Sequence, residues 1–250
     1  MTGVSTTIAG DIATIGIDCP PVNALGPDSW VKLRDVLEST SADLSVRVVI
    51  VTGGPGRFCA GADIRTLTEP TDEPALMLRL VADVAEALKD HRVPVIAAID
   101  GPTHGGGLEL ALACDLRVAS PTSTFAASGV NMGLIASVRS LVASVGETRA
   151  RTMLLTGERV DATTAKAWGL VTDLDPNPEV LAAKLATTIA SKAPHAIEST
   201  KAALGALSSL NTTEHDALVT GLFTTLVGTQ DHTEAVNAFL AKRNARFSRD

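Results

Sequence analysis

Two glycine-rich loops are the places in this 250-residue chain where the backbone itself could do chemistry. One runs from Gly53 to Asp63 after the apolar run VRVVIV, and the other, His104 to Gly107, follows VPVIAAI. Glycines let a ligand approach the main chain closely. The second loop leads into a predicted helix that starts at Leu108, whose first N–H groups have no acceptor within the helix. One N–H donor from each loop would form an oxyanion hole for a developing negative oxygen. The alternative is that the glycines only turn the chain.

Neither loop carries a nucleotide-binding fingerprint. A phosphate-binding P-loop would end in GK[ST], a dinucleotide loop would read G-x-G-x-x-G, and neither pattern is present. The chain also lacks the G-x-S-x-G elbow of the α/β-hydrolases. These absences leave two alternatives: backbone donors to an oxyanion, or glycines that only turn the chain.

Glu109 is the acidic residue that follows the second loop most closely, inside the otherwise apolar sequence LELALAC. A carboxylate buried there would cost several kcal/mol unless it had a partner. Such a group is suited to general acid–base catalysis. The alternative is a glutamate that bonds to N–H groups of its own first helical turn. The residues alone leave these two interpretations open.

The composition excludes several other functions. The 28 acidic and 21 basic residues give a net charge of −7, which argues against a nucleic-acid-binding surface. The chain has no tyrosine, so no tyrosine can act as acid or nucleophile. Its three cysteines form no CxxC pair, so we expect neither disulfides nor a metal site. We see no signal peptide and no membrane span, and predict a soluble cytoplasmic protein.

Strand and helix signals alternate in the first part of the chain and helices dominate afterwards. The pattern predicts strands at 4–9, 12–17, 46–51, 93–99, 116–119 and 170–172. It predicts helices from Pro27, at 75–88 and from Leu108, and then at 138–145, 148–155, 162–168, 178–192, 195–208, 212–228 and 231–245. We therefore predict an α/β core over residues 1–193 and a helical region over 194–250.

The motifs around these loops resemble those of the crotonase family, also called the enoyl-CoA hydratase/isomerase family. The similarity lies in FCAGADI at 58–64, GGGLELA at 105–111 and CDLRVA at 114–119. PPVNAL at 20–25 and the LLTGE…A…GLV segment between 154 and 171 also fit. These matches keep the family's order and spacing over about residues 5–247.

The resemblance implies a spiral of ββα units with a C-terminal helical region that forms trimers, often paired into hexamers. It implies an acyl-CoA thioester as ligand, with coenzyme A entering as part of the substrate and no separate cofactor. By position, the N–H groups of Ala62 and Gly106 would hold the thioester oxygen as it becomes an enolate, and Glu109 would be an acid/base. The coenzyme A and its adenine would lie along Ala60, Ala62, Asp63, Ile64, Arg65 and Gly106. Arg57 and Arg65 are candidates to meet its phosphates.

One wall of the implied site departs from the family pattern. Hydratases of the family use a second glutamate four residues after a phenylalanine; here Phe125 is in place but residue 129 is glycine. The family's glycine-rich G-x-P-G-x-G-G stretch should follow Gly133, but the chain reads LIASVR at 134–139 instead. The expected function is hydration of an enoyl-CoA in fatty-acid metabolism, and the alternative is a catalytically silent acyl-CoA binder. A structural helical assembly protein is a third alternative.

Four polar residues near the implied site are weaker candidates. His104 precedes the glycine run and could reach the thioester, although a loop histidine is more often a packing residue. Ser128, Asn131 and Ser137 flank the altered wall and could bind polar acyl groups.

Overall fold

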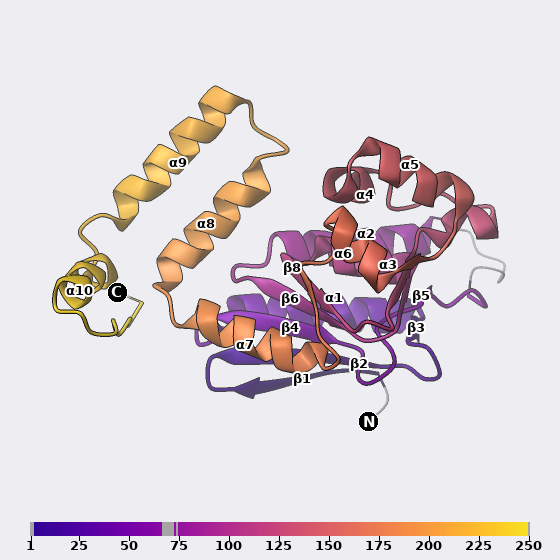
Figure 1. Ribbon diagram of the computed structural model, residues 1–250, viewed down its shortest axis with the longest axis horizontal. Helices are drawn as coiled ribbons and strands as arrows, with labels where there is room; N and C mark the ends of the chain where they lie inside the picture. The colour runs from indigo at the N-terminus through magenta and orange to yellow at the C-terminus, as the bar shows by residue number, and fades with distance from the viewer. Residues whose placement is uncertain (1–2, 67–72, 74, 250) are drawn as a thin grey trace.

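The computed structural model describes residues 3–66, 73 and 75–249. Its main sheet has the strand order β1-β2-β4-β6-β8-β11 (Figure 1). The hairpin of β1 (Gly3–Ala9) and β2 (Ile12–Asp18) turns at Gly10, whose φ of +62° explains the glycine there. The parallel strands are β2, β4 (Val48–Thr52), β6 (Val95–Ile99), β8 (Leu116–Ala119) and β11 (Asp173–Leu174).

Each long parallel strand is followed by a short strand in a second layer. β5 (Gly61–Ala62) follows β4 and pairs with β3 (Ala24–Leu25). β7 (Pro102–His104) and β9 (Thr124–Ala126) follow β6 and β8, and together with β10 (Val160–Asp161) they form a separate small sheet. A helix closes each of these units, so the expected α/β spiral of ββα units is confirmed. The sequence did not predict the short strands, because runs of two or three residues carry no periodicity.

The helices agree with the sequence prediction closely. In the core they are α1 (Pro27–Ala42), α2 (Leu76–Lys89), α3 (Gly106–Ala113), α4 (Val138–Val145), α5 (Glu147–Thr156), α6 (Ala162–Trp168) and α7 (Pro178–Ala190). A 3₁₀ helix covers Ser128–Met132, and the last three helices are α8 (Pro194–Ala206), α9 (Thr212–Leu226) and α10 (Gln230–Leu240).

The last helix, expected over 231–245, ends at Leu240. Other predicted boundaries are wrong as well. The strand expected at 170–172 lies instead at Asp173–Leu174, because Gly169 ends α6 with a φ of +81° and the N–H of Leu170 still bonds to Ala165. The helix expected from Leu108 starts at Gly106.

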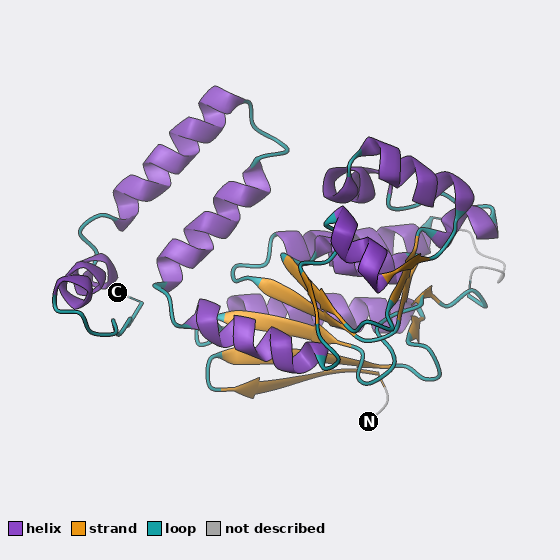
Figure 2. Cartoon of the chain, in the orientation of Figure 1, coloured by secondary structure: helices purple, strands orange, loops and turns teal. Residues whose placement is uncertain are grey.

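Both faces of the main sheet are covered by helices (Figure 2). Val49 and Val51 of β4 face the larger core, which includes residues of α1, α2 and α3. Val48 and Ile50 face the other way, against Ala182, Ala186 and Ala190 of α7. These contacts explain the uninterrupted apolar runs of β4 and β6, since a strand buried on both faces does not alternate.

The last three helices extend beyond the edge of the sheet (Figure 1). α8 is joined to the core by Lys201, whose ammonium group donates to Asp115 at 2.7 Å and to the carbonyl groups of Leu88 and Val93. Asp115 also accepts the N–H of Val95, so it is a structural residue. α9 has no buried residue in the described chain. The division into 1–193 and 194–250 stays a prediction.

Candidate functional site

The two glycine loops lie directly against each other. A Cβ on Gly107 would come within 1.9 Å of the carbonyl oxygen of Cys59, and a Cβ on Gly61 within 2.8 Å of the amide nitrogen of Gly106. The main chains also bond, because Cys59 donates to Pro102 and His104 donates to Cys59. Glycine is therefore required here because two backbones approach each other closely. The alternative that these glycines only turn the chain does not account for this contact.

The predicted donors Ala62 and Gly106 are brought together by this contact. The amide nitrogen of Ala62 lies 3.5 Å from the place that a Cβ on Gly106 would take. Gly106 is the first residue of α3, so its N–H has no acceptor within the helix and lies at the positive end of the helix dipole. The pairing of β3 with β5 fixes Gly61 and Ala62 from the other side. The arrangement offers two neighbouring backbone amide groups to one acceptor.

A buried asparagine holds the first loop in place. Asn23 is fully buried, and its side-chain amide donates to the carbonyl oxygens of Ile17, Gly53 and Phe58, at 3.0 Å each. The side-chain oxygen accepts the N–H of Cys19 at 2.8 Å. The residue ties the end of β2 to both ends of the loop segment 53–58. The sequence motifs do not indicate this supporting role of Asn23.

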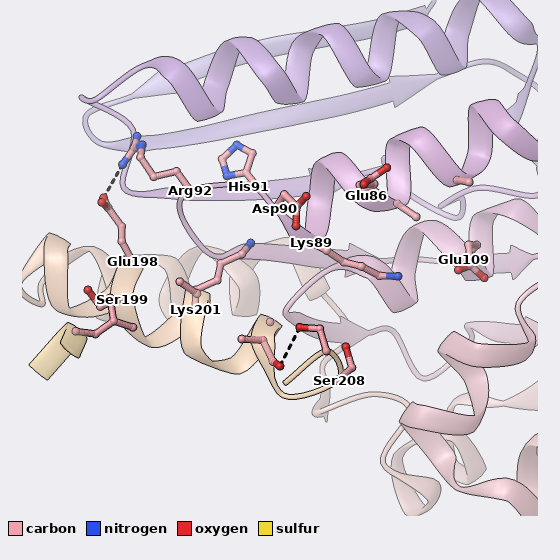
Figure 3. A pocket seen from close by; sticks show the side chains of 17 residues that line it. Glu86, Lys89, Asp90, His91, Arg92, Glu109, Glu198, Ser199, Lys201 and Ser208 are labelled. Atoms are coloured by element: carbon pink, nitrogen blue, oxygen red, sulfur yellow. Dashed lines mark hydrogen bonds and ion pairs between the residues drawn. The ribbon is translucent and has the colours of Figure 1, made fainter. Parts of the chain in front are cut away.

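The Glu109 carboxylate accepts no hydrogen bond from the N–H groups of its own helical turn among the described residues. In the described part of the chain its Oε1 accepts a hydrogen bond from the hydroxyl of Ser140 on α4, and its Oε2 is buried without a partner. The first-turn capping alternative is therefore wrong. Glu109 also borders an open cleft of about 1040 Å³, whose other residues come from α2, α8 and α9 and the segments beside them. Figure 3 shows it on α3, at the end of this cleft away from Arg92 and Glu198.

The altered wall packs its backbone close to residue 129, the position of the missing second glutamate. Gly129 lies in the 3₁₀ helix, and a Cβ there would be 3.1 Å from the carbonyl oxygen of Leu134 and 3.5 Å from the nitrogen of Ala136. The hydroxyl of Ser128 lies 3.2 Å from the position of a Cβ on Gly105, so the wall borders the second glycine loop.

The residues predicted to line coenzyme A follow one another around β5. Ala60 donates its N–H to Val22, and Asp63 donates its N–H to Leu25. The Arg65 guanidinium bonds to the carboxylate of Asp63 and keeps its pKa below the usual range. The Arg65 side chain is 85% exposed and Ile64 is exposed as well. Arg57 lies 3.6 Å from Asp18.

Two of the weaker candidates are engaged elsewhere. His104 Nε2 lies 3.0 Å from the hydroxyl of Thr124, and burial, with a smaller contribution from Arg159, lowers its pKa. The side-chain amide of Asn131 donates to the carbonyl of Gly157 at 2.9 Å, which fixes the turn after α5. Both contacts indicate packing roles. The Ser137 hydroxyl is buried without a partner among the described residues.

The described residues contain no cluster of three or more histidine, cysteine, aspartate or glutamate side chains that could hold a metal ion. Over the same part of the chain, no helix is both long and apolar enough to cross a membrane.

Comparison with known proteins identifies the family. The family model for enoyl-CoA hydratase/isomerase matches residues 7–250, and the chain belongs to this family of enzymes. Two relatives are each 34% identical: the 2,3-dehydroadipyl-CoA hydratase of Escherichia coli and the (E)-benzylidenesuccinyl-CoA hydratase of Thauera aromatica. The matches cover 90% of both chains in the first case and 98% of both in the second. These similarities favour an enzyme over the catalytically silent alternative.

Solved structures confirm the fold. The enoyl-CoA hydratase of Bacillus anthracis superimposes with a TM-score of 0.95 at 28% identity and covers 100% of both chains. The protein DspI of Pseudomonas aeruginosa superimposes with a TM-score of 0.94 at 35% identity, over 99% of this chain and 97% of that one. The crotonase-like architecture expected from the motifs is therefore present.

Proposed function

We propose that the protein hydrates the double bond of an enoyl-CoA thioester in fatty-acid metabolism. One arrangement carries this proposal: the neighbouring amide groups of Ala62 and Gly106 lie beside a helix that also presents an unpaired carboxylate oxygen of Glu109. Gly106 and Glu109 are three residues apart in α3 and so share a helix face. The hydratase names of the relatives support the same reaction.

The amide groups of Ala62 and Gly106 would stabilise the charge that develops on the thioester oxygen. When a water oxygen attacks the β-carbon, the electron pair of the double bond moves through the α-carbon onto this oxygen and forms an enolate. Backbone donors held rigidly at such a position stabilise the transition state by about 3–4 kcal/mol each. Ala60, Asp63, Ile64 and Arg65 would line coenzyme A, with Arg57 and Arg65 near its phosphates, and no separate cofactor or metal is needed.

Glu109 would perform both proton transfers. Its carboxylate takes a proton from the attacking water, and the same carboxyl group returns a proton to the α-carbon as the enolate collapses. The result is one H and one OH added across the double bond, with Glu109 restored. Residue 129 offers no second carboxylate for the water, so this chain would work with a single acid/base group.

The test is incubation with a panel of enoyl-, β-hydroxyacyl- and malonyl-type CoA esters, with products identified by mass. The panel includes the 2,3-dehydroadipyl and (E)-benzylidenesuccinyl esters for which the relatives are named. We expect a gain of 18 Da from at least one enoyl ester. A product of unchanged mass but different chromatographic retention would indicate an isomerase, and loss of 44 Da a decarboxylase. Binding without turnover across the panel would establish the silent acyl-CoA binder instead.

We also propose that the protein is a cytoplasmic homotrimer or homohexamer assembled through α8–α10. α9 has no buried residue in the described chain, and apolar side chains on these helices are exposed, Phe239 by 83%. Exposed apolar area of this kind marks an interaction surface, and the resemblance to the family indicates a second copy of the chain as its partner.

Phe223→Asp combined with Phe239→Asp is expected to dissociate this assembly. Both phenylalanines are exposed on the terminal helices, and a charge there opposes burial at an interface. Light scattering after gel filtration should give three or six times 25.8 kDa for the unchanged chain and a smaller mass for the variant. Leu155→Asp is the control, because Leu155 is 73% exposed on α5 and should leave the mass unchanged. A monomeric unchanged chain would contradict the proposal.

A further inference from the structure

We propose that Ser140 is the positioning residue for Glu109: its hydroxyl holds one carboxylate oxygen so that the other stays free for the reaction. This inference rests on the proposed role of Glu109 in the function described above. It concerns a hydrogen bond between α3 and α4 that the motifs of the sequence do not indicate.

The two oxygens of the Glu109 carboxylate have different surroundings. Oε1 accepts the hydroxyl hydrogen of Ser140, whereas Oε2 is buried and has no partner in the described part of the chain. A buried acceptor without a partner is costly, and such groups persist mainly where function requires them. Because Ser140 bonds to Oε1 only, Oε2 remains available to accept a proton. The hydrogen bond therefore selects which oxygen acts as the base.

The hydrogen bond that orients Glu109 is more important in this site than it would be in a site with two carboxylates. Residue 129 is glycine, and backbone atoms of Leu134 and Ala136 lie 3.1–3.5 Å from the position that a Cβ at 129 would take. No carboxylate at this position can share the task of holding a water molecule. The orientation of Glu109 must then come from its own contacts, and the described contact is the one from Ser140.

The surroundings of Ser140 on α4 supply a matched comparison. Ser140 and Ser144 are four residues apart in α4 and share one helix face, and Ser137 is the N-cap residue just before that helix; we call these three serines the α4 serine row. The hydroxyls of Ser137 and Ser144 are also buried, but neither has a partner among the described residues. Ser140 is the member of this row that bonds to Glu109. Removing the Ser144 hydroxyl therefore changes the same helix face without touching the carboxylate.

The first test measures turnover of the enoyl ester that gives the best rate in the panel. Ser140→Ala is expected to lower kcat by about 10–100-fold, because a displacement of a reacting group by about 1 Å can cost 10²-fold. KM should change by less than about threefold, since the hydroxyl does not contact coenzyme A in this proposal. Ser140→Thr should restore most of the rate, and Ser144→Ala should match the unchanged chain in kcat. Equal losses in Ser140→Ala and Ser144→Ala would overturn the proposal.

A double-mutant cycle separates positioning from a purely structural role. If Ser140 acts through Glu109, adding Ser140→Ala to Glu109→Gln should reduce kcat by less than about twofold more. A further loss as large as that of Ser140→Ala alone would show an independent effect and overturn the proposal.

If no ester in the panel is turned over, the proposed function fails, and the role of Ser140 is decided by crystal structures of the two serine variants. A Glu109 carboxylate that leaves its place in Ser140→Ala and keeps it in Ser144→Ala supports positioning. A carboxylate that stays in place in both variants overturns it.

Discussion

Replacing Glu109 by glutamine is expected to lower kcat for enoyl-CoA hydration by about 10²–10⁴-fold, the range for the loss of a general acid–base group. Glutamine has nearly the same shape and keeps an oxygen that can accept the Ser140 hydroxyl, so the packing between α3 and α4 should survive. Its amide cannot take a proton from water. At 1.36 kcal/mol for each factor of ten, the loss corresponds to about 3–5 kcal/mol of transition-state stabilisation.

The first measurement is the steady-state rate of hydration, monitored through the decrease in absorbance of the enoyl thioester. The second is the free energy of unfolding in urea. Glu38→Gln is the matched control, because it removes the same charge from an exposed position on α1, where Glu38 forms an ion pair with Arg34. The control should retain full activity. Turnover by Glu109→Gln at the rate of the unchanged chain would contradict the acid/base role of Glu109.

The strands that position the site could be predicted from the sequence. The runs VVIV at 48–51 and VIAAI at 95–99 are apolar at every position, which is typical of strands covered on both faces. Each of these strands is followed by one of the two glycine loops. The two strands, β4 and β6, are neighbours in the parallel sheet. Loops that leave the carboxyl ends of neighbouring parallel strands meet at one edge, so the pairing of Ala62 with Gly106 follows from topology.

The contacts that tune the site could not be predicted in this way. Ser140 and Glu109 are 31 residues apart, and nothing in the spacing of α3 and α4 specifies which hydroxyl of the row meets the carboxylate. The sequence predicts the start of α3 two residues late, because glycine has low helix propensity. Gly106 and Gly107 are helical nonetheless, since close packing against the first loop decides both the residue type and the conformation.

Gly107→Ala is the substitution for which we expect the largest loss of stability. The added methyl group would lie 1.9 Å from the carbonyl oxygen of Cys59, 2.7 Å from its carbonyl carbon and 2.9 Å from its Cβ. Two of these atoms are backbone and cannot rotate away, so α3 must move from the first loop. We expect the free energy of unfolding to fall by about 3 kcal/mol, the upper part of the range for overpacking. The separation of Ala62 from Gly106 should also lower kcat by about 10²-fold in the molecules that remain folded.

Gly26→Ala separates this steric effect from the general cost of replacing a glycine. Gly26 precedes α1 with a φ of −77°, and a Cβ there would meet no atom within 4 Å. Its free energy of unfolding should change by less than about 0.5 kcal/mol, as for most substitutions away from packed features. Urea unfolding of the three proteins measures both effects, and activity below the transition reports the state of the amide pair. If Gly107→Ala matched Gly26→Ala in stability and turnover, the close contact between the loops would not be what holds the two amide groups together.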